Sequence, residues 1–198
     1  MVRSIVEGGL WKLVFPEGEW VLHAPGKPFA GTLRREKTYA ADRGTVKETV
    51  TETDRTALTK LTETEDGLVL SGGPHSLRIR ISPLEGGLKL GFTGEEGRAY
   101  QFSLPAEAGR AVFGGGEQYR QVNLAGETVV NFVSEHIKAS TILEKALLPR
   151  KLYKEKPHSQ IGSYAPMPVF VTDERRMILF STPADGIAEL GTDAFRFT

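Results

Sequence analysis

The sequence predicts a mainly β protein, an antiparallel β-sandwich with one short helix near 139–148. Short apolar runs recur along the 198 residues, and several of them alternate with polar residues, as strands with one buried face do. Glycine occurs 22 times and proline 11 times without a repeat period, which favours many turns between short strands over disorder. We expect a single sandwich domain over 1–198, with meander strands in 1–110 and further strands and loops in 111–198.

The first strands are expected at 10–15 and 20–23, because Pro16, Glu17 and Gly18 separate two short apolar runs there. Residues 32–64 are rich in threonine and charge and contain few large side chains to bury. Two interpretations fit this stretch: a pair of long exposed strands, or a disordered loop.

From residue 58 to residue 104 the pattern predicts an antiparallel meander. Asp66-Gly67 is a hairpin-turn signal, and residues 77–81 alternate strictly, with three aliphatic side chains on one face and two arginines on the other. Residues 88–92 alternate again after a turn. Another turn is expected at 94–97, and the next inward face is expected to be that of Tyr100, Phe102 and Leu104. We assign the two arginines to a solvated face and not to an anion site.

Four further strands are expected in the second half, at 129–133, 166–172, 177–181 and 194–197. The two middle runs are expected to form a hairpin that is buried on both faces. Residues 139–148 are the convincing helical segment, since Ser140 or Thr141 can cap its start and Pro149 ends it.

Residues 113–119 (Phe-Gly-Gly-Gly-Glu-Gln-Tyr) join the two halves. Three successive glycines allow positive φ angles or a close approach of the backbone to a ligand. The glutamate, glutamine and tyrosine that follow can hydrogen-bond a polar ligand. A bulge or tight bend explains the glycines equally well.

Composition excludes several classes of function. Acidic and basic residues number 25 each, so the basic excess of a nucleic-acid-binding protein is absent. No apolar run is long enough to span a membrane, and the start lacks the apolar region of a signal peptide. We therefore expect a cytoplasmic protein with no nucleic-acid or membrane partner.

The sequence predicts neither a metal site nor a cofactor. There is no cysteine, the four histidines lack metal-ligand spacing, and neither a phosphate loop nor a dinucleotide fingerprint occurs. Scarcity of Asn, Gln, Cys and Met with many charges is typical of thermophile proteins; compositional drift is the other interpretation.

Two carboxylates stand out as candidates for general acid/base chemistry. Glu117 lies beside Gln118, and Glu135 lies beside His136, each in an apolar or glycine-rich context. Either carboxylate could equally be buried and bonded to backbone amides.

Four motifs, in this order, resemble glycoside hydrolase family 31. Residues 113–119 resemble the glycine–glutamate segment that closes the family's N-terminal β-sandwich. Residues 133–136 (Val-Ser-Glu-His) resemble the serine–glutamate segment of the sulfoquinovosidase-like branch. Residues 163–171 look like the family's Tyr-x-x-x-Pro-x-Phe strand, and 177–181 like the strand that follows it. The resemblance covers 77–198, and the first 76 residues share only β character.

The resemblance implies a supersandwich of the galactose-mutarotase-like type, serving as the non-catalytic N-terminal domain of a retaining, α-glucosidase-related α-glycosidase. In the family, the catalytic Asp nucleophile and Asp acid stand on a (β/α)₈ barrel that follows this sandwich. No segment here matches the nucleophile motif, so no catalytic residue is carried over. We expect the chain alone to be inactive and to meet carbohydrate only with the barrel present.

The residues expected near substrate in a complete enzyme are Glu117, Gln118, Glu135 and His136. After its serine–glutamate pair the sulfoquinovosidase-like branch has glycines and an arginine. This chain has Ile137, Lys138 and Ala139 instead, which puts an anionic-sugar specificity in doubt. A solvated basic loop or a contact with an anionic sugar would each explain Lys138, Arg150, Lys151 and Lys154.

Two other functions stay open: a stand-alone carbohydrate-binding sandwich and a mutarotase-like sugar epimerase. The epimerase would need a histidine acid and a carboxylate base in one cleft, for example His75 or His136 with Glu117 or Glu135. If the barrel is absent, the apolar face that packs on it should be exposed, so we expect self-association through part of residues 129–171.

Overall fold

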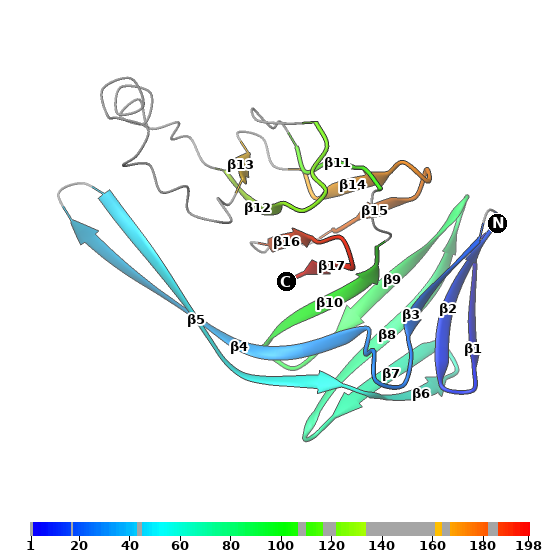
Figure 1. Ribbon diagram of the computed structural model, residues 1–198. Coiled ribbons are helices and arrows are strands. Elements are labelled where there is room, and N and C mark those ends of the chain that lie inside the picture. The colour runs from blue at the N-terminus through cyan, green and yellow to red at the C-terminus, as the bar shows by residue number, and fades with distance from the viewer. Residues whose placement is uncertain are drawn as a thin grey trace. The chain divides into compact units, whose positions relative to one another are not determined.

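The computed structural model describes residues 2–16, 18–42, 45–106, 110–116, 122–133, 161–163, 167–181 and 186–198. Throughout these residues the regular elements are strands, labelled in Figure 1. Strand pairs such as β2 (Leu10–Phe15) with β3 (Gly18–His23) run antiparallel, and β12 (Thr128–Val133) with β13 (Ile161–Ser163) is a parallel pair. The predicted mainly β, antiparallel sandwich class is confirmed. The helix expected at 139–148 lies outside the described residues.

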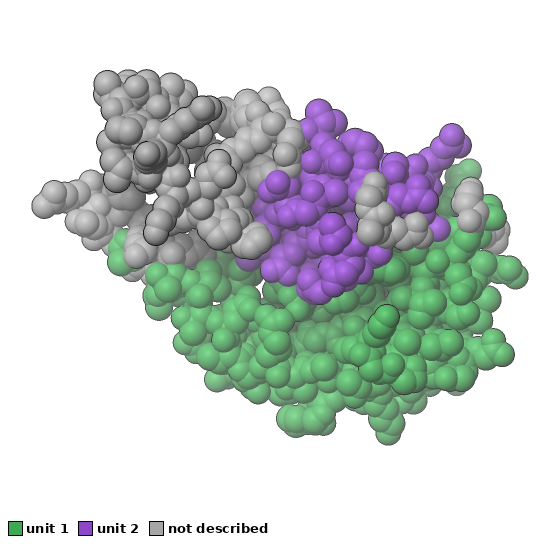
Figure 2. Space-filling view, viewed as in Figure 1, with its two compact units in different colours: residues 1–105, 198 green, residues 106–197 purple. Residues whose placement is uncertain are grey.

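The chain divides into two compact units, coloured green and purple in Figure 2. Unit 1 comprises Met1–Pro105 and Thr198, and unit 2 comprises Ala106–Phe197. The single sandwich domain over 1–198 stays a prediction. Within the described ranges, no helix has the length and apolar character needed to cross a membrane.

Unit 1 contains three groups of hydrogen-bonded strands. One antiparallel sheet follows sequence order: β1 (Arg3–Glu7), β2 (Leu10–Phe15) and β3 (Gly18–His23). A second does so too: β6 (Lys60–Thr64), β7 (Gly67–Gly72), β8 (His75–Leu84) and β9 (Gly87–Thr93). The third group has the order β10 (Ala99–Pro105), β4 (Ala30–Asp42) and β5 (Thr45–Leu58).

The threonine-rich stretch forms a long hairpin, so the strand interpretation is confirmed over the disordered loop. β4 has 13 residues and β5 has 14, and their pairing runs from Ala30↔Leu58 to Asp42↔Thr45. The register shifts between Thr32 and Arg34, which marks a β-bulge in β5. Few large side chains are needed, because the buried residues among those of the hairpin whose burial is described lie at one end of it, near Leu33 and Leu58.

The predicted meander is correct for β6 to β9 and wrong for its last strand. Leu77 and Ile79 are buried and Arg78 is exposed, as the alternation predicts. β10, however, pairs with β4 instead of continuing the meander. Alternation shows which face of a strand is buried but not which strand lies beside it.

Aromatic and aliphatic side chains fill the core of unit 1. The ring of Phe29 lies 4.9 Å from that of Trp11 and 5.5 Å from that of Phe102, measured between centroids. Phe92, which is 39% exposed, contacts Phe102 at 4.4 Å at the edge of this core, and burial of the inner side chains supplies the main stabilisation. Phe29 directly precedes β4 and Phe102 lies on β10, so this core anchors two of the strands that border the candidate sites.

Unit 2 contains two groups of strands. One has the order β11 (Val112–Gly114), β14 (Val169–Thr172) and β15 (Met177–Leu179). The other has the order β13 (Ile161–Ser163), β12 (Thr128–Val133), β16 (Gly186–Leu190) and β17 (Ala194–Phe197). The predicted strands at 129–133 and 194–197 are confirmed, whereas the sequence pattern does not predict β16.

The hairpin of β14 and β15 is confirmed, but its predicted burial on both faces is wrong. Met177 is 66% exposed and Leu179 is 60% exposed, while Phe170 of β14 is 3% exposed. Met177 and Leu179 are two positions apart on β15 and therefore share one face of the strand, and this face is left uncovered. A continuous apolar run does not reveal this, because it lacks the polar residues that mark a solvated face.

Candidate functional site

The three glycines after β11 satisfy a steric requirement of the backbone. Gly114, Gly115 and Gly116 have φ angles of 116°, 73° and 95°. A Cβ on Gly114 would lie 2.1 Å from the Val169 carbonyl oxygen, and the Gly115 N–H donates to that oxygen at 2.9 Å. The predicted positive φ angles are therefore present, and the close approach is made to the chain's own strand β14, while an approach to a ligand stays a prediction.

The residues predicted near substrate cannot be placed relative to this turn. Glu117, Gln118, Glu135 and His136 lie outside the described residues, as do Lys138, Arg150, Lys151 and Lys154. Their roles stay predictions.

A polar network in unit 1, the His75 cluster, brings together five residues: Asp54, His75, Glu95, Arg98 and Tyr100. His75 opens β8, and its Nδ1 lies 2.8 Å from Glu95 Oε2. The other Glu95 oxygen accepts the Ser76 N–H at 3.0 Å. Arg98 donates to Asp54 Oδ2 at 2.6 Å, and His75 Nε2 lies 3.8 Å from the same oxygen. The imidazole therefore lies between two carboxylates.

Two backbone features assemble the His75 cluster. Asp54 has a φ of 50° at the bulge in β5, a conformation that aspartate tolerates better than most residues. Gly94 lies against the ring of Tyr100, because a Cβ there would be 2.2 Å from the ring. The Tyr100 hydroxyl can then accept the Glu95 N–H at 2.8 Å and donate to the Ser76 carbonyl at 3.1 Å.

Both carboxylates of the His75 cluster favour the ionised state. The hydrogen bond from Arg98 lowers the pKa of Asp54. The hydrogen bond from His75, followed by that of the Ser76 N–H, lowers the pKa of Glu95. These bonds stabilise the charged form and therefore resist protonation.

The geometry of the His75 cluster argues against acid/base catalysis on a sugar. His75 and Glu95 are bonded to each other, so a ring cannot lie between them, and a general acid or base must reach the substrate's own atoms. We interpret the cluster as a structural clamp. The epimerase pairs that involve Glu117 or Glu135 fall outside the described residues. In the described ranges no group of His and acidic residues is arranged to hold a metal.

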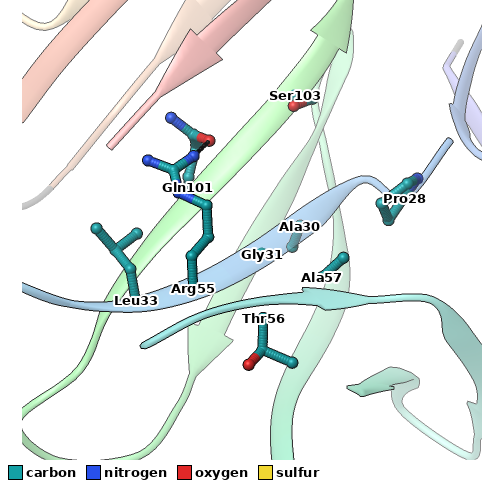
Figure 3. A pocket seen from close by; sticks show the side chains of 9 residues that line it. All are labelled: Pro28, Ala30, Gly31, Leu33, Arg55, Thr56, Ala57, Gln101 and Ser103. Atoms are coloured by element: carbon teal, nitrogen blue, oxygen red, sulfur yellow. Dashed lines mark hydrogen bonds between the residues drawn. The ribbon is translucent and has the colours of Figure 1, made fainter. Parts of the chain in front are cut away.

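A second feature of unit 1 is a hollow of about 190 Å³ over β4, β5 and β10 (Figure 3). We call it the Arg55 hollow. Arg55 donates from Nη1 to Gln101 Oε1 and from Nη2 to Glu52 Oε2, both at 2.8 Å. Gln101 Nε2 donates to Thr198 Oγ1 at 3.1 Å. The apolar part of its lining comes from Pro28, Ala30, Leu33 and Ala57.

Sequence reasoning missed both features for the same reason. Arg55 and Gln101 are 46 residues apart, and Asp54 and Arg98 are 44 apart, without a motif that links them. The glycine–glutamate pairs at 94–97 predicted a turn, which is correct, but gave no sign that Glu95 bonds His75.

The comparisons with known proteins bear on the fold. No family model matches the chain, and no curated protein matches it. Among solved structures, it matches a GH31 family sulfoquinovosidase from E. rectale, solved with the aza-sugar inhibitor IFGSQ, with a TM-score of 0.70 and 19% identity. The fold is one found in a GH31 enzyme. The match covers 98% of this chain and 30% of that chain, so this chain spans under a third of the sulfoquinovosidase.

Two further solved structures are less similar to this chain. The cycloalternan-forming enzyme from Listeria monocytogenes, solved with a pentasaccharide substrate, has a TM-score of 0.38 and 13% identity, over 98% of this chain and 18% of that chain. A GH31 dextranase from Flavobacterium johnsoniae has a TM-score of 0.36 and 11% identity, over 98% and 24%. At these scores the two add no argument. At the level of the fold, the resemblance to the GH31 β-sandwich predicted from the sequence is confirmed by the sulfoquinovosidase.

Proposed function

We propose that the chain is the non-catalytic β-sandwich domain of a retaining α-glycosidase related to the α-glucosidases. One observation carries this proposal: the fold matches 98% of this chain but only 30% of a GH31 sulfoquinovosidase. The motifs at 113–119, 133–136, 163–171 and 177–181 support the same assignment. In this role the domain supports a catalytic barrel and shapes one wall of its active site.

Carbohydrate would then reach the catalytic centre only when the barrel is present. Glu117, Gln118, Glu135 and His136 are the residues we propose near the substrate in such an enzyme. Lys138, Arg150, Lys151 and Lys154 would be the groups to test for an anionic sugar. A cytoplasmic location and a thermophilic source stay predictions from composition.

Two measurements test the proposed function. Purified residues 1–198 should not release the aryl group from an aryl α-glucoside, whereas measurable turnover would contradict the proposal. The coding sequence beyond codon 198 is the sharper test. It should encode a barrel with a pair of catalytic aspartates, and activity of that barrel should need residues 1–198. A following sequence without such a barrel would also overturn the assignment.

We also propose that the isolated chain self-associates through part of residues 129–171. Met167, within this range, is an apolar side chain that is 57% exposed, and it would belong to the face that packs on a barrel; a contiguous exposed apolar face marks an interaction surface. Sedimentation at increasing concentration should show association that Met167→Lys weakens. The matched control is Leu84→Lys, at a position in unit 1 that is 55% exposed, and it should leave association unchanged. A monomer at all concentrations would contradict the proposal.

A further inference from the structure

The Arg55 hollow has the size of a small ring-shaped ligand. Its volume is about 190 Å³, somewhat more than the roughly 150 Å³ of a cavity that accommodates benzene. It is smaller than the roughly 300–1,000 Å³ typical of drug-sized ligand pockets. A six-membered ring with a few polar substituents therefore fits, and a longer oligomer would extend into solvent.

The wall of the Arg55 hollow is part apolar and part polar. Ala30 and Leu33 are 2% and 0% exposed, so they form the rigid base of the hollow. The accessible apolar surface on which the C–H face of a ring can lie comes from the half-buried Pro28 and the exposed Ala57. Figure 3 shows the Arg55 and Gln101 side chains meeting on one side of β4, whereas the Thr56 side chain points away from them. Ser103 contributes a hydroxyl to the lining.

Hydrogen bonds hold the polar groups of the Arg55 hollow in place, and N–H groups of Arg55 remain that can donate to a ligand. A guanidinium has five N–H groups, and the bonds to Gln101 and Glu52 use one from each terminal nitrogen. Gln101 is fixed at both ends of its amide, by Arg55 and by Thr198. Groups that are already positioned lose little entropy when they bind.

The charge of the hollow favours hydroxyl groups over an anion. Glu52 already accepts from Arg55 at 2.8 Å, so an anionic ligand would compete with a carboxylate that is in place. Hydroxyls both donate and accept, so they can use the amide of Gln101 and the remaining N–H groups of Arg55 together. Arg35 lies 3.9 Å from the same Glu52, which makes a charged sugar a necessary comparison ligand.

We propose that the Arg55 hollow binds a single pyranose ring of a neutral sugar. The site belongs entirely to unit 1 and uses no residue of the predicted substrate-proximal set. It goes beyond the proposed function because it gives the non-catalytic domain a sugar contact of its own. A ligand of about a dozen heavy atoms in such an open site binds with a Kd on the order of millimolar.

The test is a titration of the ¹⁵N-labelled full chain with methyl α-D-glucoside, followed by two-dimensional NMR. Saturable shifts are expected at the amides of Arg55, Ala57, Gln101 and Ser103. Ala57→Trp fills the hollow from an exposed position and should weaken binding at least tenfold. Gln101→Ala removes one polar group and should weaken it severalfold. Thr62→Trp, at an exposed position on β6, is the matched control and should bind like the wild type.

Several outcomes of this titration would contradict the proposed sugar site. Shifts that map elsewhere, or binding that survives Ala57→Trp in a protein with a wild-type-like spectrum, would overturn the proposal. Tighter binding of methyl glucuronide than of the glucoside would contradict the proposal that the ligand is a neutral sugar. Gln101→Ala tests the site without added bulk if Ala57→Trp fails to fold. The glycosidase-domain assignment is tested by turnover and by the downstream sequence, so the two can fail separately.

Discussion

Gly114 is the residue whose backbone conformation most directly requires the amino acid found in the sequence. Its φ is 116°, and a Cβ placed on it would lie 2.1 Å from the Val169 carbonyl oxygen, which leaves no room for any other residue. Strand β11 approaches β14 there as Gly114 pairs with Phe170. The glycine is therefore needed to close the sheet, whether or not the following residues meet a ligand.

Gly114→Ala should destabilise the protein by about 2 kcal/mol or more, because the strained φ adds to a backbone clash. Gly97→Ala is the matched control, since Gly97 has a φ of 74° but nothing within 4 Å of its Cβ position. It should cost only about 1 kcal/mol. Urea unfolding measures both, and equal losses for the two variants would show that the contact with Val169 is unimportant.

Glu95 gives the His75 cluster a defined dependence on pH. Its pKa is lowered by the hydrogen bonds from His75 and Ser76, so its ionised form stabilises the folded state. This contribution is complete above the unfolded pKa of 4.5 and is lost as the pH falls through the lower folded value. Asp54, whose pKa Arg98 lowers, behaves in the same direction.

The free energy of unfolding should therefore fall between about pH 5 and pH 3, and Glu95→Gln should flatten part of that fall. Denaturant unfolding at several pH values provides the measurement. Glu85→Gln, at an exposed turn position, is the control and should retain the wild-type slope. A Glu95→Gln profile parallel to the wild type would contradict the proposed clamp.

At the scale of elements, the strands of unit 2 carry some apolar side chains that are buried and others that are exposed. Phe197 of β17 is 5% exposed and lies 5.5 Å from the ring of Phe170 and 4.4 Å from that of Phe180. Met177 of β15 is 66% exposed. Both residue types look equally suited to a core in the sequence, yet only one of these two side chains is part of it.

Phe197→Ala should cost about 3–5 kcal/mol, the usual range for a buried phenylalanine. Met177→Ala should cost less than about 0.5 kcal/mol, as exposed substitutions do. Thermal unfolding of the two variants separates them. Similar midpoints for both would mean that the aromatic contacts within unit 2 contribute little.

The local sequence pattern predicted most strands, but it predicted few of the pairings between strands. Residues 77–81 could be assigned because alternating Leu, Ile and Arg report burial directly. β16 could not, because Gly186–Leu190 has only a short and weak alternation. The partner of β10 depends on contacts with residues about 70 positions earlier, such as Ala99 with Leu33, and single-strand patterns contain no such information.

The same limit applies to the two polar features. The sequence predicted glycine-dependent backbone geometry at 114–116, since positive φ is a property of the residue itself. It did not predict that Arg55 meets Gln101 or that Asp54 meets Arg98, because these pairs form only once β4, β5 and β10 are aligned. The predicted substrate-proximal residues lie outside the described part of the chain, so their role stays a prediction.

For the molecule as a whole, charge balance has a measurable consequence. Acidic and basic residues number 25 each, which gives a formal net charge of zero at pH 7. Proteins without net charge repel one another weakly and associate more readily. Solubility of the purified chain should be lowest near pH 7 and should rise toward pH 5 and pH 9. Turbidity measured across this range tests it, and a flat profile would show that charge does not control association.

The bulge in β5 also limits how this chain can change length. Arg34 pairs with Thr53 and Thr32 with Thr56, so one extra residue is accommodated where Asp54 and Arg55 lie. Asp54 belongs to the clamp and Arg55 to the hollow, although the two are adjacent. Deleting either residue would remove the extra residue of the bulge and leave these two pairs in register, but it would remove Asp54 from the clamp or Arg55 from the hollow and take the bulge geometry away from the residue that stays. A one-residue deletion here should therefore preserve the pairing of β4 with β5 but not both polar features.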